Sequence, residues 1–257
     1  STIISFSENK NELLKIEKLI SNKSTYNFSF KKQGEIKSNI SDKDYLELVK
    51  KGISHCLRGD VFQIVLSRKF TQPYKGDDFN VYRNLRSINP SPYLFYFDYG
   101  NFKIFGSSPE AQLIINNKKA EIHPIAGTFK RTGDDLYDKE KAKELLSDDK
   151  ENSEHMMLVD LARNDLSRSC NNVVVEKDRE IQFYSHVIHL VSKVTGYLKS
   201  KSKEIIGNTF PAGTLTGAPK YKAMELINQY ETSKRQFYGG AIGMIDIYGN
   251  FNHAIII

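Results

Sequence analysis

Two carboxylates three residues apart have the spacing of a metal site. Glu151 and Glu154 begin a segment, residues 151–166, whose many apolar positions predict a buried helix. Residues at positions i and i+3 share one face of a helix, and carboxylate oxygens on a rigid helix suit Mg²⁺. Buried carboxylates can instead form ion pairs, so the alternative is that they pair with Arg163. Taken alone, this stretch favours the ion pair over the metal site.

A second candidate is the Gly-Ser-Ser-Pro-Glu sequence at residues 106–110, which ends a predicted strand. Glu110 could donate a proton there if burial raises its pKa. Alternatively, Ser107 or Ser108 caps a short helix and Glu110 completes the cap. The stretch by itself does not separate these two interpretations.

Two histidines, His186 and His189, fall in a predicted strand over residues 181–197. Because their spacing is odd, the strand directs them to opposite faces, which argues against a shared metal ion. Either histidine could act as a base near neutral pH. For each one alone, an ordinary core or surface histidine is the competing interpretation.

Three glycine-containing stretches could approach a ligand closely. Residues 210–220 place glycines and hydroxyls before a predicted helix, which is typical of an anion site, although the order of a Walker A loop is absent. Residues 124–128 follow a strand and resemble this pattern weakly. Residues 238–240 put two glycines in a predicted strand, which favours close backbone approach by a ligand.

Composition excludes several classes of protein. The chain has 257 residues and a net charge of +6, and its basic residues are spread out rather than clustered, which argues against nucleic-acid binding. An anionic small substrate fits this charge equally well. Two distant cysteines without a CxxC pair predict a reducing, cytoplasmic location, and no apolar run is long enough to span a membrane.

The periodicity of the chain predicts an α+β fold with mainly antiparallel sheets, because hairpin signals alternate with grouped helices. A helix over 41–59 has Ser41 and Asp44 as a capping pair and Gly59 at its end. The other expected helices are 11–20, 79–88, 139–146, 151–166 and 218–230. The expected strands are 61–70, 93–99, 102–105, 111–115, 120–125, 173–175, 181–197, 237–247 and 251–257, with a loop over 129–138.

Eight stretches taken in order are far more specific than any one of them: GDVFQIVLS, NPSPYLFYF, GSSPE, PIAGT, EHMMLVDLARNDLSR, YSHVIHLVS, FPAGTLTGAPK and YGGAIG. Their order resembles the chorismate-utilising enzymes, and within these most closely anthranilate synthase component I. The match covers about residues 40–257. It implies antiparallel sheets packed face to face with helices outside. It also implies a remnant of an N-terminal region over 1–40 and a catalytic domain over 41–257.

Two positions distinguish the members of this family. The water-adding isochorismate and salicylate synthases carry a basic Lys where this chain has Gln63. Activation of water by a base is not needed when ammonia is the nucleophile. Aminodeoxychorismate synthases commonly carry a nucleophilic Lys where this chain has Ala126. The resemblance therefore favours anthranilate synthase, with aminodeoxychorismate synthase as the alternative.

The resemblance implies a role for each matching residue. Glu154 holds Mg²⁺ on a chorismate carboxylate with Glu151 close by, Glu110 protonates the leaving 4-hydroxyl, and His189 removes the ring proton before pyruvate departs. The residues that line the substrate or contact it are Gly127, Thr128, Tyr238, Thr214 and Gln63. Ammonia comes from glutamine through a separate glutamine amidotransferase subunit, component II.

A further part of the resemblance concerns regulation by tryptophan. Residues 89–94 match the segment that closes the family's tryptophan feedback pocket, with Asn89, Pro92, Tyr93 and Leu94 as its candidate residues. The family's other tryptophan-binding motif, Leu-Leu-Glu-Ser, does not occur in this chain.

The chain also departs from the family pattern. It ends at Ile257, before the family's Arg for a substrate carboxylate, a Gly-rich carboxylate-binding turn and a second Mg²⁺-binding Glu, and residues 198–210 are shorter than usual. We therefore expect the 257 residues by themselves to be inactive and the complete protein that carries them to be active. The rival hypotheses are a catalytically inactive scaffold for the amidotransferase, which the intact acid and base argue against, and a nucleic-acid-binding module.

Overall fold

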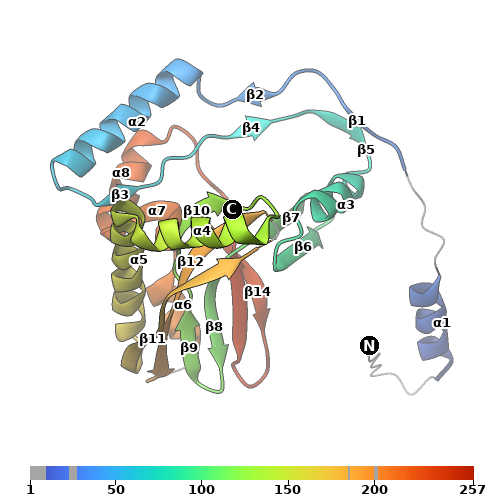
Figure 1. Cartoon of the computed structure of the whole chain (residues 1–257). Coiled ribbons are helices and arrows are strands. Elements are labelled where there is room, and N and C mark those ends of the chain that lie inside the picture. Colours follow the sequence, from blue (N-terminus) through green and yellow to red (C-terminus); the bar gives the residue numbers. More distant parts are fainter. Residues whose placement is uncertain (1–9, 23–27, 185, 200–201) are drawn as a thin grey trace.

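The computed structural model describes residues 10–22, 28–184, 186–199 and 202–257. At the centre of this part of the chain is a seven-stranded sheet with helices packed against it (Figure 1). Its order is β10-β12-β9-β8-β15-β14, and β11 pairs with β12 outside that path. The strands are β8 (Ala111–Asn116), β9 (Lys119–Ile122), β10 (Ile125–Lys130), β11 (Cys170–Phe183), β12 (Val187–Leu198), β14 (Ala241–Ile245) and β15 (Phe251–Ile255).

The remaining described strands form four two-stranded ribbons. They are β1 (Phe30–Lys32) with β5 (Tyr74–Gly76), β2 (Lys37–Ser38) with β4 (Phe70–Thr71), β3 (Gln63–Ile64) with β13 (Gly217–Ala218), and β6 (Tyr93–Asp98) with β7 (Lys103–Ser108). The helices are α1 (Lys10–Ser21), α2 (Asp42–Leu57), α3 (Phe79–Ile88), α4 (Asp135–Ser147), α5 (Asp149–Ser167), α6 (Ser202–Thr209), α7 (Gly213–Thr216) and α8 (Lys220–Tyr230). All described pairings are antiparallel, which confirms the predicted α+β class.

The main core lies between α5 and the large sheet. Val159, Ala162 and Leu166 of α5 pack against strand residues that include Leu113 and Val194, all of them nearly fully buried. The prediction that α5 is buried around most of its circumference is wrong, because its apolar side chains cover only the sheet-facing side. The opposite face carries Met156, which is 46% exposed, and an ion pair between Asp160 and Arg163.

The predicted strand over 61–70 is wrong for most of its length. Only β3 and the first residue of β4 are paired there. Between them the backbone finds other partners: the Val65 amide donates to the Thr216 carbonyl at 2.9 Å, and the Ser67 amide to Glu231 Oε1 at 2.7 Å. β-Branched and aromatic residues favour a strand only where a neighbouring strand is available.

The predicted loop over 129–138 is also partly wrong. β10 continues to Lys130, and α4 begins at Asp135. Asp134 caps this helix, because its side chain accepts hydrogen bonds from the amides of Leu136 and Tyr137. A polar sequence rich in aspartate is therefore the start of a helix rather than a loop.

The predicted strand over 181–197 spans a hairpin turn. β11 ends at Phe183 and β12 begins at Val187, so His186 lies in a bend between them, while Ser185 is outside the described residues. The sequence there has no Gly, Pro, Asn or Asp to indicate a turn. Helices α2 and α3 were placed to within a residue or two, and Ser41 caps α2 as expected, accepting from the Asp44 amide.

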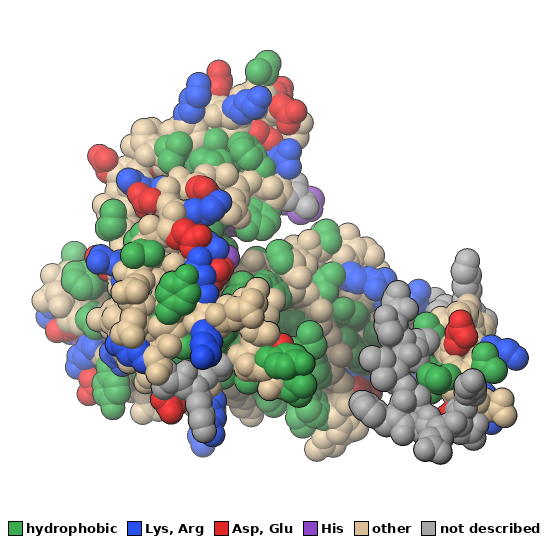
Figure 2. Space-filling view, turned by 90° about the horizontal axis from the view of Figure 1, so that it is seen from below, with side chains coloured by type: hydrophobic (Ala, Val, Ile, Leu, Met, Phe, Trp, Pro, Cys, Tyr) green, Lys and Arg blue, Asp and Glu red, His purple; other side chains and the backbone are tan. Residues whose placement is uncertain are grey.

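Charge is mixed over the surface in view. On the face shown in Figure 2, Lys and Arg side chains are interspersed with Asp and Glu. In the described part of the chain, none of the helices has the length and apolarity needed to cross a membrane. The mixed charge on this face does not support the nucleic-acid-binding alternative.

One buried histidine makes stability depend on pH. His253 in β15 is 4% exposed, and burial lowers its pKa to about 4. An unfolded chain binds the proton at a pKa of about 6.5, so stability is full above pH 6.5 and declines as pH falls towards 4. We expect a loss of up to about 3 kcal/mol over that range.

The expected loss is measured by urea unfolding at pH 7 and pH 4.5. His253→Leu should have a smaller difference between the two pH values than the wild type, because the variant has no imidazole to protonate at this site. His186→Gln, which removes an exposed histidine, is the control and should keep the wild-type difference. Equal pH dependence in His253→Leu and the wild type would contradict the assignment.

Candidate active site

Most of the predicted site residues line one cavity of about 420 Å³. They come from β3, the turn between β7 and β8, β10, α5, β12 and α7, so the fold gathers them from distant parts of the sequence. The predicted residues that line it are Gln63, Glu110, Gly127, Thr128, Glu151, Glu154, His189 and Thr214. Pro109, Ala126 and Leu158 are among the other lining residues.

Glu110 lies in the tight connection from β7 to β8. Its carbonyl accepts a hydrogen bond from the Ile255 amide, which holds the turn against β15. Ser107 and Ser108 end β7 and do not cap a helix, so the capping alternative is wrong. Thr214 Oγ1 donates to Glu110 Oε1 at 3.3 Å, yet burial outweighs this contact and raises the pKa of Glu110 to about 7. A carboxyl group with this pKa can donate a proton near neutral pH.

A bulge in β10 positions His189. Ala126 pairs with Leu190 and Thr128 with His189, which leaves Gly127 as the extra residue. His189 Nδ1 lies 3.0 Å from the Gly127 carbonyl oxygen and 3.2 Å from Thr128 Oγ1. A carbonyl can only accept, so Nδ1 carries the hydrogen, and in the neutral imidazole Nε2 is then left without one. This tautomer gives His189 a free nitrogen that can take a proton.

The bulge requires glycine at position 127. The φ of Gly127 is +70°, and a Cβ built there would lie 2.7 Å from Leu145 Cδ1 and 3.4 Å from Glu151 Oε2. Any larger residue would therefore strain the backbone and push against α4. The close approach brings the Gly127 backbone next to the Glu151 carboxylate of α5.

The carboxylate pair is available for a cation. Asp148 caps α5 by accepting from the Glu151 amide at 2.9 Å, which places Glu151 in the first turn and Glu154 in the next. Arg163 pairs with Asp160 instead, so the predicted alternative of pairing with Arg163 is not realised. Lys150 lies 3.5 Å from Glu151 Oε1 but is largely exposed.

These donors fit Mg²⁺. Over the described ranges, no group of three or more His, Cys, Asp and Glu residues could hold a metal ion. Two carboxylates beside an open cavity nevertheless suit Mg²⁺. This ion usually binds one or two protein carboxylates and completes its coordination shell with water and substrate oxygens.

Gln63 presents an unused acceptor. It pairs with Ala218 through the backbone, its side chain lines the cavity, and its Oε1 is buried without a hydrogen-bond partner in the described structure. A buried amide oxygen without a partner is costly, so a ligand that donates an N–H or O–H would be favoured there. An amide cannot remove a proton, which separates this position from a basic lysine.

A smaller cavity of about 240 Å³ adjoins the first and shares Pro109 and His189 with it. Asn89, Pro92 and His186 also line it, so the prediction that His186 faces away from His189 is wrong because His186 precedes β12. Tyr184, which sequence analysis did not single out, packs edge-on against His189 with ring centroids 5.3 Å apart.

The other candidate feedback residues begin β6. Burial raises the pKa of Tyr93, while Leu94 is 36% exposed. Residues 89–92 connect α3 to β6, and the Ser91 amide donates to Ser107 Oγ at 3.1 Å. Whether tryptophan binds at this segment stays a prediction.

Tyr238 lies elsewhere. It occupies a turn before β14 rather than a strand, and it lines two other cavities, of about 420 and 670 Å³, instead of the one at Glu110. The Gly239 amide donates to the Ile256 carbonyl at 2.8 Å, and the Arg235 guanidinium lies 5.5 Å from the centre of the Tyr238 ring.

Residues 210–220, which were expected to form an anion site, mainly make contacts within the protein. Among the hydroxyls described in this stretch, that of Thr214 contacts a cavity carboxylate, and α7 is a single turn. Lys220 Nζ lies 2.5 Å from Asp165 Oδ2 and 2.8 Å from the Thr209 carbonyl, so its charge is used inside the protein. Pro219 is the N-cap of α8, so this helix begins two residues later than predicted.

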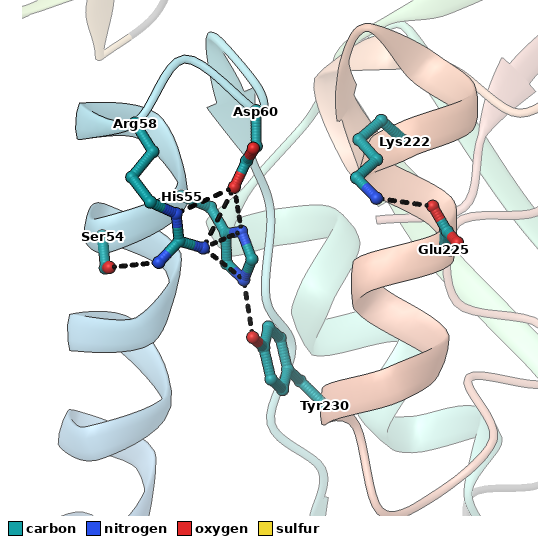
Figure 3. A network of polar contacts seen from close by, with 7 residues as sticks. All are labelled: Ser54, His55, Arg58, Asp60, Lys222, Glu225 and Tyr230. Atoms are coloured by element: carbon teal, nitrogen blue, oxygen red, sulfur yellow. Dashed lines mark hydrogen bonds and ion pairs between the residues drawn. The ribbon is translucent and has the colours of Figure 1, made fainter.

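A polar network outside the cavity joins α2 to α8 (Figure 3). His55 is 8% exposed, and its ring nitrogens lie 2.7 Å from Asp60 Oδ2 and 2.6 Å from the Tyr230 hydroxyl. Arg58 also contacts Asp60, at 3.0 Å. Asp60 directly precedes the segment that carries Gln63, and sequence analysis missed the network because its members are far apart in the chain.

We expect Tyr230→Phe to lower the free energy of unfolding by about 1 kcal/mol, because it removes the hydroxyl that contacts buried His55. Urea unfolding measures the change. Tyr221→Phe on the same helix is a matched control, since Tyr221 is 85% exposed, and it should leave stability within about 0.5 kcal/mol of wild type. Equal stability of both variants would show that the network contributes little.

The sequence profile of the family described as chorismate binding enzyme matches residues 3–257. The chain belongs to the chorismate-binding enzyme family. The resemblance drawn from the eight stretches is therefore confirmed.

Relatives with similar sequences are named anthranilate synthase component 1. The protein from Aquifex aeolicus is 44% identical over 225 residues, which cover 86% of this chain and 46% of the relative. The protein from Bacillus subtilis is 45% identical over 226 residues, covering 86% and 44%. The chain thus spans about half the length of the curated relatives it matches.

Solved structures agree. Anthranilate synthase component I from Streptococcus pneumoniae superposes with a TM-score of 0.80 at 36% identity, covering 98% of this chain and 58% of that one. The menaquinone-specific isochorismate synthase from Escherichia coli also has a TM-score of 0.80, at 20% identity over 97% of this chain and 60% of that one. The second likeness concerns the fold alone.

Proposed function

We propose that this chain supplies the chorismate-converting site of an anthranilate synthase large component, which makes anthranilate and pyruvate from chorismate and ammonia. One observation carries the proposal: a buried carboxyl group with a pKa of about 7 and a histidine with a free Nε2 line the same cavity as a carboxylate pair. The names of relatives about 45% identical support the same reaction.

Glu110 is the proton donor in the first half of the reaction. Ammonia forms a bond to the ring of chorismate while the 4-hydroxyl departs as water, and that departure requires a proton. The carboxyl group of Glu110 can be protonated at neutral pH, and Thr214 holds one of its oxygens.

His189 is the base in the second half. Its Nε2 takes the ring proton, the bond between the ring and the enolpyruvyl oxygen breaks, and pyruvate departs as the ring becomes aromatic. The Gly127 carbonyl holds the required tautomer through Nδ1, so the bulge in β10 serves the chemistry directly.

Gln63 and Ala126 favour ammonia as the nucleophile. The free Gln63 Oε1 can accept a hydrogen bond from ammonia but cannot deprotonate water. Ala126 lines the same cavity and offers no amine that could form a covalent bond with the ring. An aminodeoxychorismate synthase is the second candidate, because it also consumes chorismate and ammonia. Its product carries the amine in place of the 4-hydroxyl and keeps the enolpyruvyl group, so no pyruvate leaves.

Glu151 and Glu154 would hold Mg²⁺. When bound, the ion would neutralise a carboxylate of the substrate and so favour binding of a dianion beside two protein carboxylates. The proposed partner is a glutamine amidotransferase subunit that supplies ammonia, and the proposed inhibitor is tryptophan at residues 89–94.

The proposal is tested by omitting each component from an assay of the intact protein. With chorismate, Mg²⁺ and ammonium chloride we expect a fluorescent aromatic amine to form. Without ammonium no product should form, because Gln63 cannot activate water. Formation of isochorismate in the absence of ammonium would contradict the proposal.

A further inference from the structure

Glu110 faces a second, much smaller space behind the substrate cavity. A crevice of about 40 Å³ is lined by residues of β8, α5 and the segment leading into α7. Glu110, Leu158 and Thr214 line both spaces, so they form the wall between them. The carboxyl group therefore has one side towards the substrate and another towards the crevice.

Gln112 presents an unused hydrogen-bond acceptor to this crevice. It lies two residues after Glu110, is 4% exposed, and lines the crevice. Its Nε2 donates to the Thr209 carbonyl at 3.3 Å, while its Oε1 is buried without a hydrogen-bond partner in the described structure. Leaving a buried acceptor unpaired costs about 1–3 kcal/mol, which a bound water would offset.

The crevice has the size and chemistry for a water molecule. A space of about 40 Å³ exceeds the roughly 10–15 Å³ that one water needs. Apart from Gln112, the polar residues around it are Glu110, Thr214, Thr209 and Asp165, and the other walls are apolar. A water there can find the two or more polar partners that ordered buried waters require.

Close packing fixes the shape of this space. Gly213 also lines the crevice, and a Cβ added to it would lie 2.0 Å from Leu161 Cδ2. The charged groups at its border are already paired, because Asp165 and Lys220 lie 2.5 Å apart. The crevice is therefore a small, rigid space with one unused acceptor beside a carboxyl group.

We propose that the crevice binds an ordered water, held by Gln112 Oε1, that hydrogen-bonds the Glu110 carboxyl group from the side opposite the substrate. Gln112 is then a positioning residue that acts on the reaction through this water and Glu110. The expected effect on turnover rests on the proposed function, whereas the binding of the water does not.

The consequence follows from the state of Glu110 after it gives up its proton. The carboxylate is then buried, and among the described residues Thr214 is the side chain that donates a hydrogen bond to it. A water held by Gln112 supplies a second donor and keeps the carboxylate in one orientation. Removing that water should slow the step that depends on Glu110 and leave substrate binding largely unchanged.

The first test is structural and does not depend on activity. High-resolution crystal structures of the intact wild-type protein and of Gln112→Met are compared, since Met has a similar length and no carbonyl. We expect a water within hydrogen-bonding distance of Gln112 Oε1 and Glu110 in the wild type, and none in the variant. A dry crevice in the wild type, or a water that stays in Gln112→Met, would overturn the proposal.

The second test is kinetic and uses a matched control. Gln112→Met should lower kcat about 10-fold with the KM for chorismate within about two-fold of wild type, as for the loss of one hydrogen bond. His253→Leu removes another buried polar group with an unpartnered atom that lines neither cavity at Glu110, and it should keep the wild-type kcat. An unchanged kcat in Gln112→Met overturns the positioning role.

Failure of the proposed function would look different. In that case the wild type itself would not convert chorismate, and all three proteins would be equally inactive. The crystallographic comparison would still decide whether Gln112 holds a water.

Discussion

Glu110→Gln should reduce kcat about 1,000-fold, within the range of general acid catalysis. The amide has nearly the same shape and can still accept the hydrogen bond from Thr214, so chorismate should still bind. It cannot deliver a proton to the departing hydroxyl. Steady-state kinetics of the intact protein with chorismate and ammonium measure the loss.

The pH profile gives the same prediction a second readout. Burial raises the pKa of Glu110 to about 7, and the acid must be protonated to work, so kcat/KM of the wild type should fall as pH rises above 7. The residual activity of Glu110→Gln should lack that fall. Glu144→Gln changes an exposed carboxylate on α4 and should match the wild type. A kcat within ten-fold of wild type in Glu110→Gln would exclude this residue as the acid.

Glu154→Gln should have the second large effect, a rise of at least about 100-fold in the Mg²⁺ concentration needed for half-maximal activity. The substitution leaves Glu151 as the only carboxylate of the proposed pair and replaces a charged ligand with a neutral one. Titration of activity with MgCl₂ and calorimetric titration of the protein with Mg²⁺ measure the change independently.

The control for this prediction lies on the same helix. Asp160→Asn removes a carboxylate on the exposed face of α5, where Asp160 pairs with Arg163. It should leave the Mg²⁺ requirement at the wild-type value. If both variants respond alike, the helix rather than a specific ligand is responsible, and the metal assignment fails.

The sequence could predict the site where local patterns carry the information. Glu110, Gly127 and His189 each lie in or next to a predicted strand, and the structure brings them to one cavity. The spacing of Glu151 and Glu154 placed them one turn apart on a helix that is present. The distances between these elements came only with the tertiary structure.

Two of the wrong predictions have the same physical cause, because the local structure there depends on partners that are distant in the chain. The run over 61–70 lacks a neighbouring strand along most of its length, so its β-propensity is realised only in β3 and at Phe70. Tyr238 lies in a turn held by the contact of Gly239 with Ile256. His186 differs, because it precedes the strand that was expected to include it, and the sequence there has no Gly, Pro, Asn or Asp to mark the end of the preceding strand.

Gln112 and the network around His55 were missed for the same reason. Gln112 lies in β8 just after the turn that carries Glu110, and its contact with the Thr209 carbonyl joins positions 97 residues apart, which no local pattern indicates. The contact of His55 with Tyr230 joins positions 175 residues apart, and nothing local indicates it.

The most direct test of the central claim is the identity and ratio of the products. The intact protein is incubated with chorismate, Mg²⁺ and ammonium chloride, and the aromatic product and pyruvate are quantified together. Anthranilate and pyruvate in equal amounts are the result expected if Glu110 and His189 act in succession. Aminodeoxychorismate without pyruvate would contradict that account and assign the site to the other branch of the family.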